Sequence, residues 1–349
     1  MPKMIFGGFC KEEIIFTRMR LNKSTKIFIN YLLGPLLFFW LLWSIYQQVQ
    51  HQPQLGTSWI HIKEAFTSSK VFYLVGIVLL MLVNWGIEAV KWQLLVSAVH
   101  PMRFITAFEA VLSGVSFSVT TPNRIGDYLG RMLYMPDGKR LKIISLTLVG
   151  SVSQLLVTLV AGTISFFLLR HYLLQAGMLG TIAYQFAFFA LLFVCAILTM
   201  LYLNVVAIEK WLERLLRKTS YLYLIEGLRS LGMQRLLRLL LLSVGRYSVF
   251  VIQYILAFYL FDVEVSLIHT VAVMGLVFLA LAIIPSVVLL EVGIRGQVSL
   301  KLIGLFTVNS LGILLTSVTV WFINLVIPAV AGSLLILGIK VFKLRYEER

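Results

Sequence analysis

Long apolar runs separated by short polar or charged breaks follow one another along almost the whole chain. Five runs are long enough for a helix to cross a bilayer, which takes about 20 residues: they are Ile27–Tyr46, Val71–Val99, Ile143–Leu169, Leu179–Val206 and Leu239–Phe261. Leu302–Leu337 is expected to hold about two more spans, with breaks at Asn309, Asn324 and Pro328. The pattern predicts an all-α, polytopic membrane bundle of about 7–8 membrane segments.

Two apolar segments are interrupted in the same way. Phe104–Val119 is followed by Pro122, and His269–Leu290 contains Pro285 near its end; a glycine, an acid and an arginine lie close after each segment. We predict that both fold as re-entrant, broken-helix hairpins, because irregular backbone at membrane depth survives only where protein or a water-filled cavity covers it. The residues expected to break the helices are Pro122, Gly126, Pro285 and Gly293.

The two breaks divide one transmembrane domain, residues 27–345, into repeat-like halves at about 71–170 and 239–337. Interrupted segments at corresponding places indicate an internal inverted repeat with a site near the midplane. One question stays open in the sequence. If residues 269–290 cross the membrane, the basic C-terminal tail is cytoplasmic; if they re-enter, the tail lies outside, against the charge rule.

Charge sets the expected orientation. The chain is 60% hydrophobic, with 30 Lys+Arg against 15 Asp+Glu. Residues 1–26 and the amphipathic linker 207–238 are both strongly basic, which places them, with the N-terminus, in the cytoplasm. Basic residues flanking apolar spans argue against nucleic-acid binding. We expect an integral protein of a bacterial-type cytoplasmic (inner) membrane; residues 1–18 fit the fold poorly, and Met19 is the expected native start.

Charged residues near the breaks are the candidate site. A charge at membrane depth costs about 2.5–3.5 kcal/mol and usually faces a cavity. Arg124 offers a planar fork suited to phosphate, Arg131 lies on the same helix face, and Asp127 can orient either arginine. Glu291 and Arg295 would complete the pocket from the other hairpin. We therefore predict a pocket for an anionic lipid headgroup, with secondary contributions from Glu88, Asn123 and Arg246. The alternative is that these charges only pair with one another to hold the hairpins.

Two further polar features lie inside predicted spans. Glu88 and Lys91 are three residues apart and can pair, either as a snorkelling pair near the cytoplasmic end of the span or with Glu88 facing the central cavity. Gln154 is expected to make an interhelical hydrogen bond.

Catalytic chemistry is weakly represented. The five histidines are isolated in sequence, and the two cysteines have no metal-ligand spacing. No nucleophile motif, phosphate-binding loop or metal cluster is present in the sequence. We therefore predict no catalytic residue, no cofactor and no metal.

The motifs at the two breaks resemble those of the lysylphosphatidylglycerol synthase transmembrane region, a flippase-like membrane family with stand-alone members. Its first motif reads roughly Pro-Gly-Arg-x-Gly-Glu, and residues 122–127 follow it with Asn123 for the first glycine and Asp127 for the glutamate. Its second ends roughly in Gly-x-Arg-Glu; Gly293 and Arg295 are kept, but the acid stands at Glu291. An arginine of the family's last span is missing near Trp321.

The resemblance implies a helical bundle with two re-entrant hairpins and a cavity that moves an anionic or aminoacylated phospholipid, or a lipid-linked headgroup, across the membrane. No soluble stretch is long enough for the synthase domain, so lysyl transfer is expected to be absent. Two alternatives remain. One is a membrane-embedded transferase acting on a lipid, with Asp127 or Glu291 as base. The other is a scaffold for an envelope-lipid biosynthesis enzyme.

Overall fold

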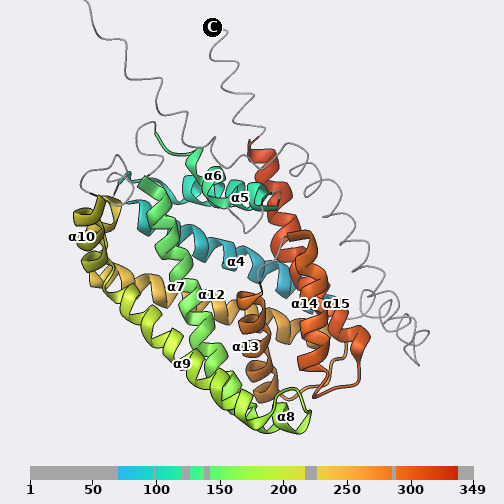
Figure 1. The fold of residues 1–349 in the computed structure, drawn as a ribbon. Coiled ribbons are helices and arrows are strands. Elements are labelled where there is room, and N and C mark those ends of the chain that lie inside the picture. The colour runs from blue at the N-terminus through green and yellow to red at the C-terminus, as the bar shows by residue number, and fades with distance from the viewer. Residues whose placement is uncertain are drawn as a thin grey trace, which may run out of the picture. The chain divides into compact units, whose positions relative to one another are not determined.

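The computed structural model describes residues 70–336 except 98, 120, 122–125, 137–141, 217–225 and 285–287 (Figure 1). The regular elements of these residues are helical, which confirms the predicted fold class. They are α4 (Val71–Val96), α5 (Phe104–Val119), α6 (Gly126–Met132), α7 (Lys142–Leu168), α8 (Arg170–Gln175), α9 (Thr181–Leu203), α10 (Val205–Leu216), the 3-10 turn η4 (Glu226–Ser230), α12 (Met233–Leu260), α13 (Leu267–Ile283), α14 (Val288–Ile303), α15 (Ser310–Trp321) and the π-helical turn η5 (Phe322–Val326), after which the helix continues to Ile336.

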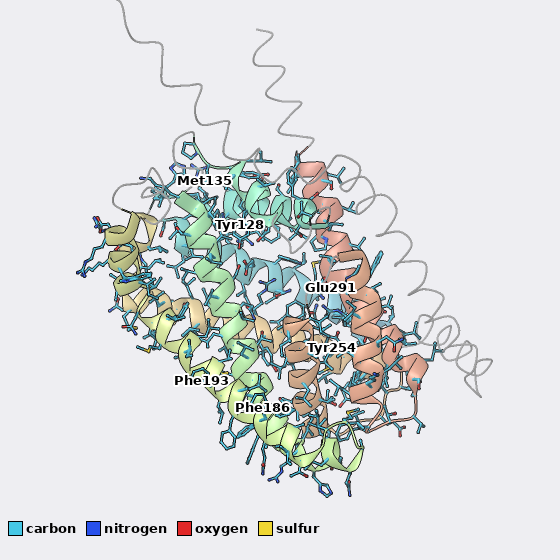
Figure 2. The ribbon with its side chains drawn as sticks, viewed as in Figure 1. Tyr128, Met135, Phe186, Phe193, Tyr254 and Glu291 are labelled. Carbon is cyan, nitrogen blue, oxygen red and sulfur yellow. The ribbon has the colours of Figure 1, made fainter. Side chains whose placement is uncertain are left out.

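Five helical runs in this part of the chain are long and apolar enough to cross a membrane: α4, α7, α9, α12 and Ser310–Ile336. The first four overlap predicted spans, whereas the predicted span Ile27–Tyr46 lies outside the described residues. Side chains on α9 point away from the bundle, and Phe186 is 78% exposed and Phe193 66% (Figure 2). Apolar surface of this extent belongs in lipid. The chain is an integral membrane protein.

The prediction of about two spans in Leu302–Leu337 is wrong, because Ser310–Ile336 is one continuous helix. Asn309 caps its start by accepting a hydrogen bond from the Gly312 N–H at 2.9 Å. Pro328 has no N–H for the carbonyl of Asn324, four residues earlier, which normally breaks a helix. Here the π-helical turn η5 widens the helix before Pro328, and Trp85 Nε1 of α4 donates to the Asn324 carbonyl at 3.2 Å.

The first predicted break forms a tight helical hairpin. Gln93 at the end of α4 donates to the Met102 carbonyl at 2.9 Å, so α5 starts beside that end of α4. After the break, α6 folds back along α5. A Cβ added to Gly126 would overlap the α5 backbone at Phe117. A Cβ added to Gly130 would overlap the α5 backbone at Ser113. The two glycines allow this close approach.

The second break also forms a hairpin, and the structure answers the question of whether residues 269–290 cross. The hairpin starts after Asp262, at the end of α12. It ends before Asn309, whose side chain donates to the carbonyls of Phe261 at 3.1 Å and Asp262 at 3.0 Å. Residues 263–309 therefore return to the end of the bundle where they began. Helix Ser310–Ile336 then reaches α5, where Ser333 and Ser116 are hydrogen-bonded at 2.6 Å. The single span Ser310–Ile336 thus ends on the α5 side, after a hairpin that does not cross the bundle.

The helices α4 and α12, which begin the two halves, pack antiparallel. Lys70 at the start of α4 pairs with Asp262, just past the end of α12, at 2.6 Å. Because each hairpin follows the end of one of these helices, the two hairpins enter the bundle from opposite ends (Figure 1). The order long helix, short helix, break, helix, long helix occurs in both halves. This is the arrangement that an inverted repeat requires; the repeat itself stays a prediction.

Candidate functional site

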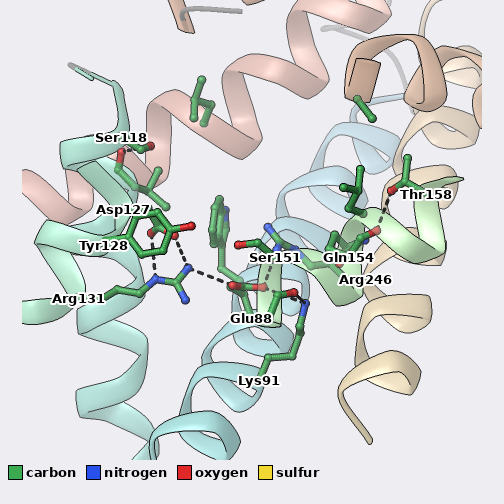
Figure 3. A pocket seen from close by; sticks show the side chains of 16 residues that line it. Glu88, Lys91, Ser118, Asp127, Tyr128, Arg131, Ser151, Gln154, Thr158 and Arg246 are labelled. Carbon is green, nitrogen blue, oxygen red and sulfur yellow. Dashed lines mark hydrogen bonds and ion pairs between the residues drawn. The ribbon is translucent and has the colours of Figure 1, made fainter. Parts of the chain in front are cut away.

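A polar cavity of about 420 Å³ lies beside the first hairpin (Figure 3). Most of its walls come from α4, α5, α6 and α7, and α12, α13 and η5 contribute one residue each. The lining residues are Trp85, Glu88, Lys91, Val115, Ser118, Asp127, Tyr128, Arg131, Gly150, Ser151, Gln154, Leu155, Thr158, Arg246, Ala282 and Leu325. The volume suits a small polar group, at the low end of the range for ligand pockets.

Glu88 occupies the centre of the charged wall. Its carboxylate accepts hydrogen bonds from Arg131 Nη2 at 3.0 Å and Arg246 Nη1 at 2.6 Å, and it pairs with Lys91 Nζ at 3.6 Å. These three cations come from α6, α12 and α4, respectively. The Glu88 side chain is 12% exposed and that of Lys91 only 1%. One carboxylate therefore ties together three helices that are far apart in the sequence.

The position of Glu88 decides between the two interpretations of the Glu88–Lys91 pair. The pair forms, but it does not snorkel to the surface, because Lys91 is fully enclosed and its Nζ lies 3.4 Å from the Gly150 carbonyl of α7. Packing of α4 against α12 on one side and α7 on the other turns this face of α4 inward. Glu88 faces the cavity.

Asp127 orients Arg131 within α6. The two residues are one helical turn apart, and Arg131 Nε donates to Asp127 Oδ1 at 3.0 Å while Nη2 lies 2.8 Å from Oδ2. The guanidinium also lies over the ring of Trp92, 5.2 Å from its centroid. With Glu88 on its other edge, Arg131 is held in one orientation, and only 4% of the residue is exposed. Such a preorganised fork is suited to an oxyanion.

Arg246 is fixed from the opposite side of the cavity. Besides Glu88, its Nε donates to Asn84 Oδ1 at 2.8 Å, and its guanidinium lies 5.1 Å from the Trp85 ring centroid. Asn84 in turn donates to the side chain of Asn324 at 3.2 Å, and Asn324 donates to Gln253 at 3.0 Å. This buried amide chain connects α4, α12 and the last helix, so the position of Arg246 depends on all three.

Most of the other lining residues were not singled out as site residues from the sequence; Trp85, Tyr128 and Ser151 are examples. Trp85 lies beneath Arg246, as Trp92 lies beneath Arg131. These tryptophans could have been found from the sequence, because each lies within one turn of a charged residue inside an apolar span. Aromatic faces stabilise desolvated cations. Tyr128 follows Asp127 directly, and Ser151 lies one turn before Gln154; neither carries a distinguishing pattern.

Among the described lining residues, the second hairpin contributes Ala282 of α13 but not Glu291 or Arg295, the two charges expected to complete the pocket. Glu291 and Arg295 pair with each other at 2.8 Å, and Arg295 Nη1 donates to the Tyr254 hydroxyl at 3.2 Å. The Glu291 side chain is 10% exposed and that of Arg295 14%, and neither is among the described lining residues of the cavity. Gly293 is buried in the same helix. Their side chains are engaged in holding α14 to α12.

Four residues of the predicted site and hairpin breaks lie outside the described residues: Pro122, Asn123, Arg124 and Pro285. Asp127, Arg131, Glu88 and Arg246 are therefore the predicted site residues that the structure brings together.

One histidine is not isolated, contrary to the expectation from sequence. His269 Nδ1 lies 2.7 Å from Ser266 Oγ, and its Nε2 lies 3.1 Å from the Tyr172 hydroxyl. Tyr172 is distant in the sequence, so spacing could not reveal it. Within the described part of the chain, no three His, Cys, Asp or Glu residues are grouped as metal ligands would be.

Comparison with known proteins gives one match. The family model described as the lysylphosphatidylglycerol synthase TM region matches residues 28–332. No curated protein and no solved structure matches the chain.

Proposed function

The chain belongs to the family of lysylphosphatidylglycerol synthase transmembrane regions, and from this premise we propose that it is a lipid translocase whose cavity receives an anionic headgroup. The lipid would be an anionic or aminoacylated phospholipid, or a lipid-linked headgroup, of the cytoplasmic membrane. Its acyl tails would stay in the bilayer while the headgroup passes between the helices.

The charge balance of the cavity is the observation that carries this proposal. Among the described lining residues, three cations, Lys91, Arg131 and Arg246, face two carboxylates, Glu88 and Asp127. Three minus two leaves one positive charge among these described residues. An excess of charge buried among apolar helices is costly. A headgroup with one negative charge neutralises the excess, which favours an anionic ligand over a neutral or cationic one.

The geometry also gives a binding mode. Arg131 and Arg246 both donate to Glu88, one to each carboxylate oxygen. A phosphate has the same kind of acceptor oxygens and forms strong bidentate contacts with guanidinium groups. A phosphate that displaces Glu88 from Arg246 would leave Glu88 paired with Lys91 and leave Arg131 paired with Asp127. Both arginines thus keep partners throughout the exchange.

The exchange would loosen the connection between the hairpin and the scaffold. Glu88 is the bridge between Arg131 on α6 and Arg246 on α12. When a phosphate replaces the Glu88 carboxylate at Arg246, the connection between α6 and α12 depends on a ligand that can leave. We propose that this allows the first hairpin to move and the headgroup to pass. Glu291 and Arg295 would keep the second hairpin fixed against Tyr254.

Transport by purified protein tests the proposal. Proteoliposomes containing a fluorescent anionic phospholipid should show accelerated movement of the label between leaflets, and Arg246→Gln should abolish the acceleration. Lys210→Gln, which removes one positive charge from an exposed position of α10 outside the cavity lining, is the matched control and should transport like the wild type.

The outcome that rejects the proposal is equal transport by wild type and Arg246→Gln in proteins with the same thermal unfolding temperature. Incubation with radiolabelled lipids separates translocation from transfer. Recovery of a new covalent lipid product would assign the protein to the transferases instead.

A further inference from the structure

Lys91 is held less closely than the other two cations of the cavity. Its Nζ lies 3.6 Å from the Glu88 carboxylate (Figure 3) and 3.4 Å from the Gly150 carbonyl. That carbonyl already accepts a hydrogen bond from Ser153 Oγ at 2.6 Å. An ammonium has three hydrogens to donate, yet within the described part of the chain both acceptors near Nζ lie beyond the usual hydrogen-bond distance. Only 1% of the side chain is exposed, so a charge here is costly.

The charges that act on Lys91 come from three helices. Glu88 of α4 attracts the ammonium, whereas Arg131 of α6 and Arg246 of α12 repel it. Among the described lining residues, α5, α7, α13 and η5 present no charge. Arg131 has Asp127 as a second partner at 2.8 Å, and Arg246 lies 2.6 Å from Glu88. Lys91 therefore shares its carboxylate with two cations that are closer to it.

The excess positive charge of the empty cavity can be removed at Lys91. Arginine stays protonated in proteins, whereas a buried lysine can release its proton. Protonation of Glu88 or Asp127 would increase the excess instead. Loss of the Lys91 proton requires no side chain to move, because a neutral amine can still donate to the Gly150 carbonyl. Lys91 is thus the lining cation that can change its charge.

We propose that Lys91 carries a co-transported proton, so that one proton moves with each singly charged anionic headgroup. The inference rests on the proposed function. In the empty cavity the Lys91 amine is neutral, and the described lining charges sum to zero. A phosphate that displaces Glu88 from Arg246 leaves the carboxylate to Lys91. The amine lone pair then binds a proton from the water on the side from which the headgroup enters.

Release reverses these steps on the other side of the membrane. As the headgroup leaves, Glu88 returns to Arg246, and the Lys91 ammonium loses its proton to the water on that side. The proton contributes one positive charge and the headgroup one negative charge, so each cycle moves no net charge. Transport then responds to a pH gradient and not to the membrane potential.

A small anion such as chloride is the other way to neutralise the empty cavity. Like the headgroup, it would have to displace Glu88 from Arg246, whose Nη1 donates to that carboxylate at 2.6 Å. Loss of a proton from Lys91 leaves this hydrogen bond in place. The arrangement of the charged side chains therefore favours the proton.

Gradients imposed on proteoliposomes test the inference with the full-length wild type. Trace fluorescent phosphatidylglycerol, which carries one negative charge, is the probe. A pH gradient should move the label toward the leaflet that faces the alkaline side, by about ten-fold for each unit of pH difference. A potassium diffusion potential set with valinomycin at equal pH should leave the distribution unchanged. Replacing chloride by gluconate should change neither result.

Substitution of Lys91 assigns the proton to this side chain. Lys91→Met keeps a long side chain without charge, so the label should stop responding to the pH gradient and begin to respond to the potential, because the headgroup now crosses with one negative charge. Lys91→Gln should do the same and provides a polar replacement if the first variant is unstable. Lys210→Gln, at an exposed position of α10 outside the cavity lining, is the matched control and should behave like the wild type.

The results that contradict the inference differ from those that contradict the proposed function. Label that moves in the wild type but follows the potential and not the pH gradient overturns the proton and leaves the translocase in place. Movement that requires chloride would assign the neutralisation to anion exchange. A pH response that persists in both Lys91 variants would show that another group carries the proton. Failure of the wild type to move the label under any gradient rejects both proposals.

Discussion

The hairpins α5–α6 and α13–α14 each carry an acid followed four residues later by an arginine. The pairs Asp127–Arg131 and Glu291–Arg295 have the same closest N–O distance, 2.8 Å. The two arginines differ in the group they contact besides their own acid. Arg131 pairs with the carboxylate of Glu88, which also pairs with Lys91 and Arg246, whereas Arg295 donates to the neutral hydroxyl of Tyr254. The first arrangement lines a cavity and, among its described residues, carries an excess positive charge. The second joins one acid to one arginine, whose Nε is buried without a hydrogen-bond partner.

This comparison shows that the short motif does not make the site. The same acid–arginine spacing serves two purposes, depending on what the opposing helix presents. On α4 the opposing residues are Glu88 and Trp92; on α12 they are Tyr254 and its neighbours. The helix facing each hairpin decides whether the arginine is available to an anion.

The largest effect is expected at Glu88. Glu88→Gln keeps the shape but leaves Arg246 and Lys91 without their carboxylate, and breaking a buried pair by removing one partner costs about 3–5 kcal/mol. Chemical unfolding in detergent should show this loss. Glu213→Gln, at the exposed pair with Arg229 on α10 and η4, should change stability by less than about 1 kcal/mol; equal losses in the two variants would contradict the central role of Glu88.

Removing each acid–arginine pair as a unit compares the two hairpins directly. Asp127→Asn combined with Arg131→Met should weaken binding of an anionic phospholipid about ten-fold or more, because a charge-assisted hydrogen bond is lost. Glu291→Gln combined with Arg295→Met should leave lipid affinity unchanged, since replacing a whole buried pair by uncharged side chains is often tolerated. Affinity can be measured by lipid titration of the purified variants. A reversed order of effects would move the site to the second hairpin.

A smaller difference is expected from glycines in the two hairpins. A Cβ on Gly130 would overlap the α5 backbone at Ser113 and Gly114, which cannot move aside, so Gly130→Ala should lose about 1–3 kcal/mol of stability. A Cβ on Gly296 of α14 would lie 3.2 Å from Leu314 Cδ2, the end of a flexible side chain. Gly296→Ala should therefore be nearly neutral in thermal unfolding, and a similar loss in both variants would show that α6 is packed no more tightly than α14.

Much of the fold could be predicted from the sequence, because the bilayer imposes a simple length and hydropathy rule on each span. The hairpins were also predictable, since each break combines a proline with glycine and charge. The continuous last helix was not. Asn324 and Pro328 have the signature of a break, and the helix persists because Trp85, 239 residues away in the sequence, donates to the carbonyl that Pro328 leaves unpaired.

The site was predictable only in part, for a related reason. Spacing shows that Glu88 and Lys91 share a helix face, but the direction of that face is set by the packing of α4 against α7 and α12. Arg246 could be recognised as a buried charge, yet its pairing with Glu88 spans 158 residues. Glu291 and Arg295 follow the same local pattern as Asp127 and Arg131, so the sequence could not tell that Tyr254 takes up the second arginine.

Identification of the lipids that remain bound after purification tests the central claim most directly. Wild-type protein and the Glu291→Gln, Arg295→Met double variant should both retain an anionic phospholipid that mass spectrometry detects, and Arg246→Gln should lose it while staying folded. Retention of the same lipid in the same amount by Arg246→Gln, or only neutral and cationic lipids on the wild type, would contradict the assignment of this cavity to a negatively charged headgroup.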